Sequence, residues 1–151
     1  MFLAIAILLA AGVYGQDPQH CIHNNVDSIA ADKVIEKVVA DADVNGDHEL
    51  SPLEVIIEFI GKFDTNGDTM IPRDEFVAKW HELYRDVPEF ANYIFTHLDQ
   101  TNDGFLGLFD FVPLQAIMDI DHDGRVSDIE FTIYMTHLYQ DCVPYKNQNS
   151  A

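Results

Sequence analysis

A short acidic segment that occurs four times is the feature that most constrains this chain. The pattern Asp-x-Asn-Gly-Asp begins at Asp43 and at Asp64, and two related patterns, with Asp fifth and Gly sixth, begin at Asp99 and Asp119. An acidic residue recurs at the twelfth position of each. Oxygen ligands at this alternating spacing suit Ca²⁺, which takes about six to eight of them. We therefore expect four cation-binding loops, named loops one to four, at residues 43–54, 64–75, 99–110 and 119–130.

In such a loop the ligands come from side chains at positions 1, 3, 5 and 12, from the backbone carbonyl of position 7, and from a side chain or a water at position 9. On this pattern the predicted calcium ligands are Asp43, Asn45, Asp47, Glu49 and Glu54 in loop one; Asp64, Asn66, Asp68, Met70 and Glu75 in loop two; Asp99, Thr101, Asp103, Phe105 and Asp110 in loop three; and Asp119, Asp121, Asp123, Arg125 and Glu130 in loop four.

The four loops match the ligand pattern of a calcium loop to different degrees. Loop four matches the pattern at every position. Loop two has Thr69 at the sixth position, where the chain turns through positive φ and a β-branched residue is strained, and Pro72 leaves the ninth position to a water. Loop three has the neutral Thr101 and the short Asp110 as ligands. We expect it to bind most weakly and to approach a magnesium-like six-coordination.

Loop one allows two registers. A start at Asp41 puts glycine sixth but leaves His48 at the apolar eighth position and Pro52 at the twelfth, where neither fits. A start at Asp43 puts Leu50 at the eighth position and His48 at the sixth, and histidine tolerates positive φ better than most residues. The register that starts at Asp43 is therefore predicted.

These loops resemble those of the EF-hand calcium-binding superfamily, and the resemblance covers about residues 29–138. It implies an all-α fold in which calcium loops pair through short antiparallel bridges at their eighth positions. The chain looks most like secreted invertebrate EF-hand proteins with four loops, some of which belong to mineralised or extracellular matrix.

The distances between the loops predict how they pair. Residues 76–98 have room for two helices, one through Trp80 and Tyr84 and one through Phe95 and Leu98, with a break at residues 86–88. Loops two and three should therefore pair, through Ile71 and Leu106.

Residues 55–63 and 111–118 are too few for two helices and a turn, so one short helix must serve both flanking loops in each case. Pro113 is expected to kink or delay the second of these helices. A shared helix holds its two loops at opposite ends, so loop one should pair with loop four through Leu50 and Val126, which nests one pair inside the other. Pairing between the two chains of a dimer is the alternative.

The N-terminal segment and the two cysteines indicate secretion. Residues 1–15 form an uncharged apolar run typical of a secretory signal peptide, and residues 16–27 form a polar leader with Cys21. Residues 28–139 are the predicted calcium-binding domain, and residues 140–151 a flexible tail with Cys142. In an oxidising compartment we expect these cysteines to form a disulfide, worth about 4 to 5 kcal/mol by loop closure. Free thiols or an intermolecular bridge are the alternatives.

The large negative net charge excludes some classes of partner. The chain of 151 residues has 26 acidic and 8 basic residues, a formal net charge of −18, which would be repelled by nucleic acid. No later segment is long enough to span a membrane. The sequence predicts a secreted protein, monomer or homodimer, that acts as an extracellular calcium buffer or as an acidic protein associated with basic matrix proteins or mineral. The alternative is a calcium sensor that exposes an apolar groove to a partner. No catalytic constellation is recognised, so we do not expect an enzyme.

Overall fold

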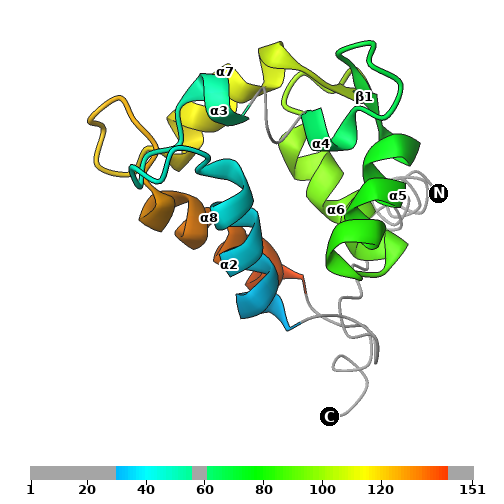
Figure 1. The fold of residues 1–151 in the computed structure, drawn as a ribbon, viewed down its shortest axis with the longest axis horizontal. Coiled ribbons are helices and arrows are strands. Elements are labelled where there is room, and N and C mark those ends of the chain that lie inside the picture. Colours follow the sequence, from blue (N-terminus) through cyan, green and yellow to red (C-terminus); the bar gives the residue numbers. More distant parts are fainter. Residues whose placement is uncertain (1–29, 56–60, 143–151) are drawn as a thin grey trace, which may run out of the picture.

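The computed structural model describes residues 30–55 and 61–142. The predicted signal peptide, the leader with Cys21 and most of the predicted tail lie outside the described residues. The described part is mostly helical, with one small two-stranded sheet (Figure 1). In chain order its elements are α2 (Ala31–Ala42), α3 (Pro52–Glu54), α4 (Gly61–Phe63), β1 (Ile71–Pro72), α5 (Arg73–Tyr84), α6 (Pro88–Leu98), β2 (Phe105–Leu106), α7 (Leu108–Met118) and α8 (Asp128–Asp141).

Two antiparallel helix pairs contain most of the helical residues that the structure describes. Helix α2 packs on α8 because each has an apolar stripe at helical spacing, with Val34 and Val38 on α2 and Met135 and Leu138 on α8 all buried. Helices α5 and α6 form the second pair (Figure 1). The predicted break between them is confirmed, since Arg85 ends α5 in a left-handed conformation and Pro88 opens α6 at a position that needs no backbone donor.

Helix α7 connects the two pairs and contacts both α6 and α8 (Figure 1). It runs unbroken from the end of loop three to the start of loop four, so the predicted single helix between these loops is confirmed. Of the two effects expected at Pro113, a kink or a delay of the helix, the delay is excluded, because α7 begins five residues earlier, at Leu108. Pro113 is half-buried inside α7 and leaves the Phe109 carbonyl without its helical N–H donor. The other predicted shared helix includes α3 and α4, but residues 56–60 between them lie outside the described part.

Both predicted loop pairings occur, and both lie within one chain. Ile71 pairs with Leu106 in an antiparallel register, as predicted. The backbone N–H of Leu50 donates to the carbonyl of Val126 at 2.7 Å, beside an antiparallel bridge between Glu49 and Ser127. Pairing between two chains is therefore not needed to complete either bridge.

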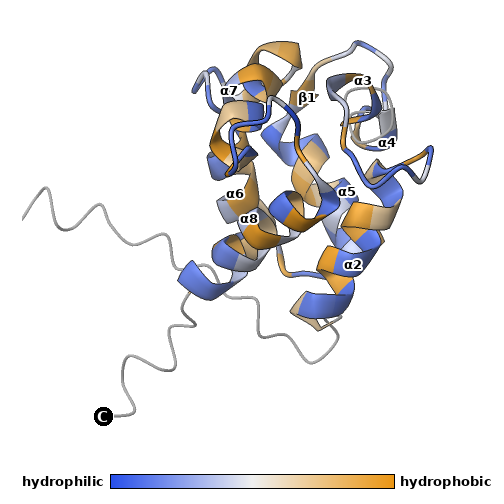
Figure 2. Ribbon diagram, turned by 90° about the vertical axis from the view of Figure 1, so that its left-hand side faces the viewer, coloured by the Kyte–Doolittle hydropathy of each residue, from blue (hydrophilic) through white to orange (hydrophobic). Residues whose placement is uncertain are grey.

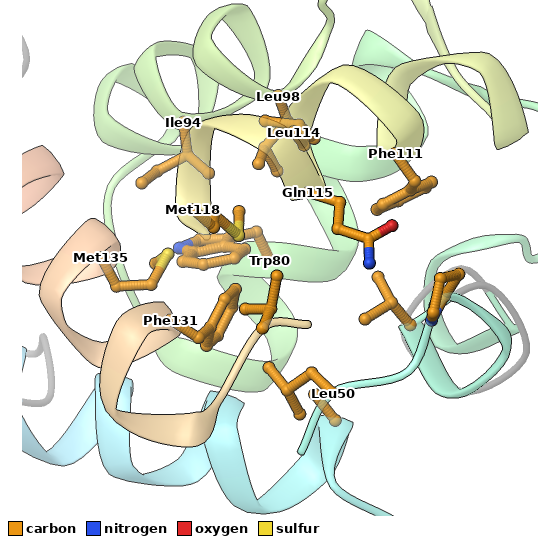
Figure 3. Close-up of a pocket in the computed structure, with 14 residues that line it drawn as sticks. Leu50, Trp80, Ile94, Leu98, Phe111, Leu114, Gln115, Met118, Phe131 and Met135 are labelled. Carbon is orange, nitrogen blue, oxygen red and sulfur yellow. The ribbon is translucent and has the colours of Figure 1, made fainter. Parts of the chain in front are cut away.

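An aromatic cluster fills the centre of the α4, α5 and α6 side. The Phe63 and Phe76 rings stack with centroids 4.8 Å apart, Trp80 lies 5.4 Å from Phe76, and Tyr84 lies 4.6 Å from Trp80. All four side chains are fully buried. Trp80 also faces an apolar cavity of about 50 Å³ beneath α7, lined by residues of both helix pairs (Figure 3). The two halves of the molecule therefore share one core.

A buried carboxylate ties the break between α5 and α6 to α8. Asp86 accepts hydrogen bonds from the Trp80 indole N–H at 3.1 Å and from the Tyr139 hydroxyl at 2.7 Å. Helix α8 continues to Asp141, beyond the predicted domain boundary at residue 139, and Cys142 after it is buried rather than part of a flexible tail. Cys142 is disulfide-bonded, as the predicted bridge requires, while Cys21, the other cysteine of the sequence, lies outside the described part.

Among the residues that the structure describes, every helix is too short or too polar to cross a membrane.

The buried tyrosines predict loss of stability in alkali. Burial raises the pKa of Tyr134 to about 12, and burial together with Asp86 raises the pKa of Tyr139. An unfolded chain ionises its tyrosines near pH 10, so between about pH 10 and 12 the unfolded state binds fewer protons and the free energy of unfolding falls as pH rises. Urea unfolding should show a decrease of about 2 kcal/mol over this range from Tyr134 alone. Tyr134→Phe should lessen the decrease, and an unchanged pH dependence would contradict the assignment.

Candidate metal centres

The four predicted loops share one backbone conformation. In each, the residues at positions 4 and 6 have positive φ, between 55° and 85°. These residues are Gly46 and His48, Gly67 and Thr69, Asn102 and Gly104, and His122 and Gly124. In the described part the only other non-glycine residue with positive φ is Arg85. Glycine stands at position 4 in loops one and two and at position 6 in loops three and four, so two turn positions, rather than the one considered from sequence, define the loop.

This turn brings the first carboxylate inside each loop. The backbone N–H of the sixth residue donates to the aspartate at position 1 at 2.8–3.1 Å in all four loops. The N–H of the seventh residue donates to the aspartate at position 5 at 2.8–3.0 Å. The carboxylate at position 12 closes the ring by accepting an N–H from position 2 or 3. The acids at positions 1, 5 and 12 of each loop are thus all bonded to backbone N–H groups of their own loop.

Loops one and four gather carboxylates most tightly. Oxygen atoms of Asp43, Asp47 and Glu54 lie within 4.8 Å of one another, and so do those of Asp119, Asp121 and Glu130. Like charges at this distance repel unless a cation or protons neutralise them. All these donors are oxygens, the set that suits Ca²⁺ or Mg²⁺ rather than softer metals, so the residues fit a hard cation.

The acidity of Asp121 reports this crowding. A backbone hydrogen bond from Asp123 lowers the pKa of Asp121, but burial and the charges of Asp123, Glu130 and Asp119 together raise it above its usual value. A carboxylate whose ionisation is disfavoured by its neighbours gains most from a bound cation. The arrangement in loop four is therefore compatible with a cation as the neutralising group.

The glutamate at position 12 of loops one and four, a predicted ligand, is oriented by a capping box. The Ser51 hydroxyl accepts the Glu54 N–H at 3.2 Å, and the Glu54 carboxylate accepts the Ser51 N–H at 3.1 Å. Ser127 and Glu130 make the same pair of bonds at 3.2 and 2.8 Å. The Ser51 hydroxyl lowers the pKa of Glu54, and the Ser127 N–H lowers that of Glu130. Both glutamates are thereby held ionised and aimed into their loops.

Sequence reasoning gave Ser51 and Ser127 only the role of ninth-position groups. The Ser-x-x-Glu signal of a capping box was available in both loops and would have identified the first residues of α3 and α8.

Loop two has the same backbone turn, but its carboxylates lie farther apart. Its carboxylates Asp64, Asp68 and Glu75 are not among the groups whose oxygens gather within 4.8 Å in the described residues. The Glu75 Oε1 atom accepts the backbone N–H and the hydroxyl of Thr65. Its Oε2 atom is buried and has no hydrogen-bond partner among the described residues. A buried carboxylate oxygen without a donor is costly, so a cation would stabilise it. Asn66 is turned to the backbone, where its Oδ1 atom accepts the Asp68 N–H at 2.9 Å.

In loop three the carboxylate oxygens accept hydrogen bonds from groups of the same loop. Asp99 and Asp110 are both buried. One oxygen of Asp110 accepts the N–H and the hydroxyl of Thr101 at 3.0 Å, and the other accepts the Gly107 N–H at 2.8 Å. Asp99, Asp103 and Asp110 do not form a tight carboxylate cluster in the described residues. A cation here would meet the neutral Thr101 and no tight carboxylate cluster, so it would neutralise less crowded charge than in loop four, which supports the expectation that this loop is weakest.

The side chains at position 7 lie outside the loops. Met70, just before β1, and Phe105, the first residue of β2, are exposed. Glu49 and Arg125 form an ion pair of 2.8 Å between loops one and four. The His48 ring nitrogen contacts Asp128 at 3.0 Å across the same interface. The sequence predicted backbone ligands at these positions but not the two side-chain links, because the partners are more than 70 residues apart.

Comparison with protein-family models, with curated proteins and with solved structures found no match to this chain.

The backbone of loop two predicts a stabilising substitution. Thr69 is exposed with φ of 66°, a conformation that costs a β-branched residue about 1 kcal/mol or more. Thr69→Gly should raise the free energy of unfolding by about 1 kcal/mol, measured by urea titration. Gly67→Ala, which puts a side chain at φ of 75°, is the matched control and should lower it by a similar amount. A loss of stability in Thr69→Gly would show that the backbone of Thr69 is not strained.

Proposed function

We propose that this chain is a secreted calcium-binding protein of the EF-hand superfamily, with four EF-hand loops in a nested arrangement. It acts as an extracellular calcium buffer or as an acidic protein associated with matrix or mineral. The observation that carries the proposal is the backbone turn that all four loops share, with carboxylates held inside each ring. Such turns concentrate negative charge, and a hard cation neutralises it.

In this proposal each loop holds one Ca²⁺ through the predicted ligands, and the ion supplies charge neutralisation and cross-links the loop. Loops one and four have the strongest support, from their carboxylate clusters and capping boxes. Four ions would reduce the formal charge from −18 to −10. The remaining charge keeps the protein soluble and attracts basic matrix proteins or mineral surfaces.

Secretion rests on the apolar run of residues 1–15 and on the disulfide at Cys142, a bond that persists in oxidising compartments. A role in ion binding rather than catalysis is supported by the helix histidines. The His81 ring contacts the Asp86 carbonyl at 2.7 Å, and the His97 ring contacts the Tyr93 carbonyl at 2.9 Å. These contacts hold both rings against the backbone, where they act as structural groups.

The second candidate function is a calcium sensor, and the cavity beneath α7 is the observation that favours it. The lining is almost wholly apolar and includes Met118, Phe131 and Met135 (Figure 3). Its volume of about 50 Å³ is far too small for a partner helix, so a sensor would have to open on binding calcium. Calcium-dependent binding of a hydrophobic dye would favour this function, and dye binding that calcium leaves unchanged would count against it.

Calorimetric titration of the oxidised protein with calcium, in a millimolar magnesium background, tests the main proposal. We expect three or four sites with dissociation constants of about 10⁻⁴ to 10⁻³ M, the range of extracellular calcium modules. Cooperative binding near micromolar calcium would favour the sensor instead. Absence of any heat of binding, checked by a second probe such as calcium-dependent thermal stability, would contradict both functions.

A single substitution tests the assignment of loop four. Glu130→Gln removes one of the gathered charges and half of a two-oxygen ligand, so it should weaken that site about tenfold or more and remove one site from the titration. Glu89→Gln changes the same chemistry on the exposed surface of α6 and is the matched control. Equal stoichiometry and affinity in both variants would show that Glu130 is not a ligand.

A further inference from the structure

Helix α7 has an outer face with no polar side chain. Its outward half consists of Leu108, Phe109, Val112, Pro113, Ala116 and Ile117, which we call the outer face of α7. Phe109 is 81% exposed and Val112 67% exposed. The two polar residues of α7, which is described throughout its length, are directed elsewhere: Asp110 is buried in loop three, and Gln115 donates to the Gly124 carbonyl at 3.2 Å.

Packing of the core does not explain this face. The opposite side of α7 already supplies Phe111, Leu114 and Met118 to the buried core. A helix that is apolar on all sides is normally buried on all sides, because exposed apolar area is unfavourable in water. Figure 2 shows α7 coloured as hydrophobic along most of its length, next to loops coloured as hydrophilic.

The exposed apolar residues are concentrated at this helix. In the described part of the chain, six of the eleven exposed large apolar side chains lie between residues 105 and 120. Phe105 and Ile120 extend the outer face of α7 beyond its two ends. Single exposed apolar residues are ordinary, but a contiguous patch marks an interaction surface.

The charges around the patch limit what can cover it. Loop three lies at one end of α7 and loop four at the other, and residues 99–130 contain eight acidic residues and one basic residue, Arg125. Arg125 is already paired with Glu49. The formal charge of this segment is −7, and two bound calcium ions would reduce it only to −3. The outer face of α7 is therefore an apolar strip with negative charge at both ends, with or without calcium.

We propose that the outer face of α7 binds an amphipathic helix of another protein, whose apolar side carries Lys or Arg near both ends. Helix α7 is 11 residues long, or about 16 Å, so three turns of a partner helix would cover it and place basic side chains over loops three and four. The apolar strip supplies burial of surface, and the acidic ends supply orientation and attraction.

Charge argues against two other occupants. A second copy of this chain placed on the same face would bring its own acidic loops against loops three and four, in either orientation, and like charges would repel. An anionic membrane would be repelled in the same way. A basic helix is the occupant whose charge complements the surface. This docking surface lies on the outside of α7 and differs from the cavity beneath it, which a sensor would have to open.

The probe for this surface is an amphipathic helical peptide of leucine and lysine, about 14 residues and 20 Å long, labelled with a fluorophore. Fluorescence anisotropy with the purified, oxidised protein in millimolar calcium should show saturable binding. A peptide with glutamate in place of lysine should not bind, and added salt should weaken binding of the lysine peptide because it screens the acidic ends. Equal binding of both peptides would overturn the charge argument.

Variants locate the site. The triple variant Phe109→Gln, Val112→Gln and Ile117→Gln keeps good helix formers at exposed positions, and it should weaken peptide binding about tenfold or more while circular dichroism stays unchanged. The control Ile129→Gln with Ile133→Gln removes exposed apolar side chains from α8 and should change affinity by less than about twofold. The single variant Val112→Lys, which places a like charge under the peptide, should also weaken binding.

Three results would overturn the proposal. The first is wild-type affinity for the peptide in both the triple variant and Val112→Lys. The second is sedimentation equilibrium that shows a dimer which the triple variant dissociates, since the occupant would then be a second copy. The third is binding to anionic vesicles that the triple variant abolishes. None of these results depends on how many calcium ions bind, so the calcium titration can fail or succeed independently.

Discussion

Repulsion among carboxylates held in four small loops is the constraint on which the rest of this structure depends. Each loop turns through two residues of positive φ, and the N–H of its sixth residue donates to the aspartate at position 1. The N–H groups offset part of the repulsion, and a hard cation would offset the rest. The crowding is greatest in loops one and four, and these are the loops linked to each other by the Glu49–Arg125 ion pair.

The loops also determine where the helices begin and end. Helices α2, α6 and α7 each end one residue before the first aspartate of a loop, and α3 and α8 each begin one residue after the serine of a capping box. Helix α7 therefore has its length determined at both ends by loops three and four. It must also cover the shared core, which explains its buried side, whereas neither the loops nor the core requires its apolar outer face.

Local chemistry made much of this predictable. Ligand spacing is a local property, so the register of loop one and the conformation of His48 and Thr69 follow from a few neighbouring residues. Chain length between loops was enough to predict both antiparallel pairings, because eight or nine residues cannot form two helices. Proline placement was a weaker guide to where a helix begins, since α7 starts five residues before Pro113 and includes it.

The sequence by itself determined where the four loops turn and the order of their pairing, since both depend on spacing along the chain. The tertiary structure alone decided which apolar residues are buried. Phe109 and Phe111 are the same residue type and lie two residues apart on α7. Phe109 is nevertheless largely exposed, whereas Phe111 packs in the core. Helix α7 is apolar on every side, so periodicity could not identify its inner side, and only the packing of α6 and α8 against it did so.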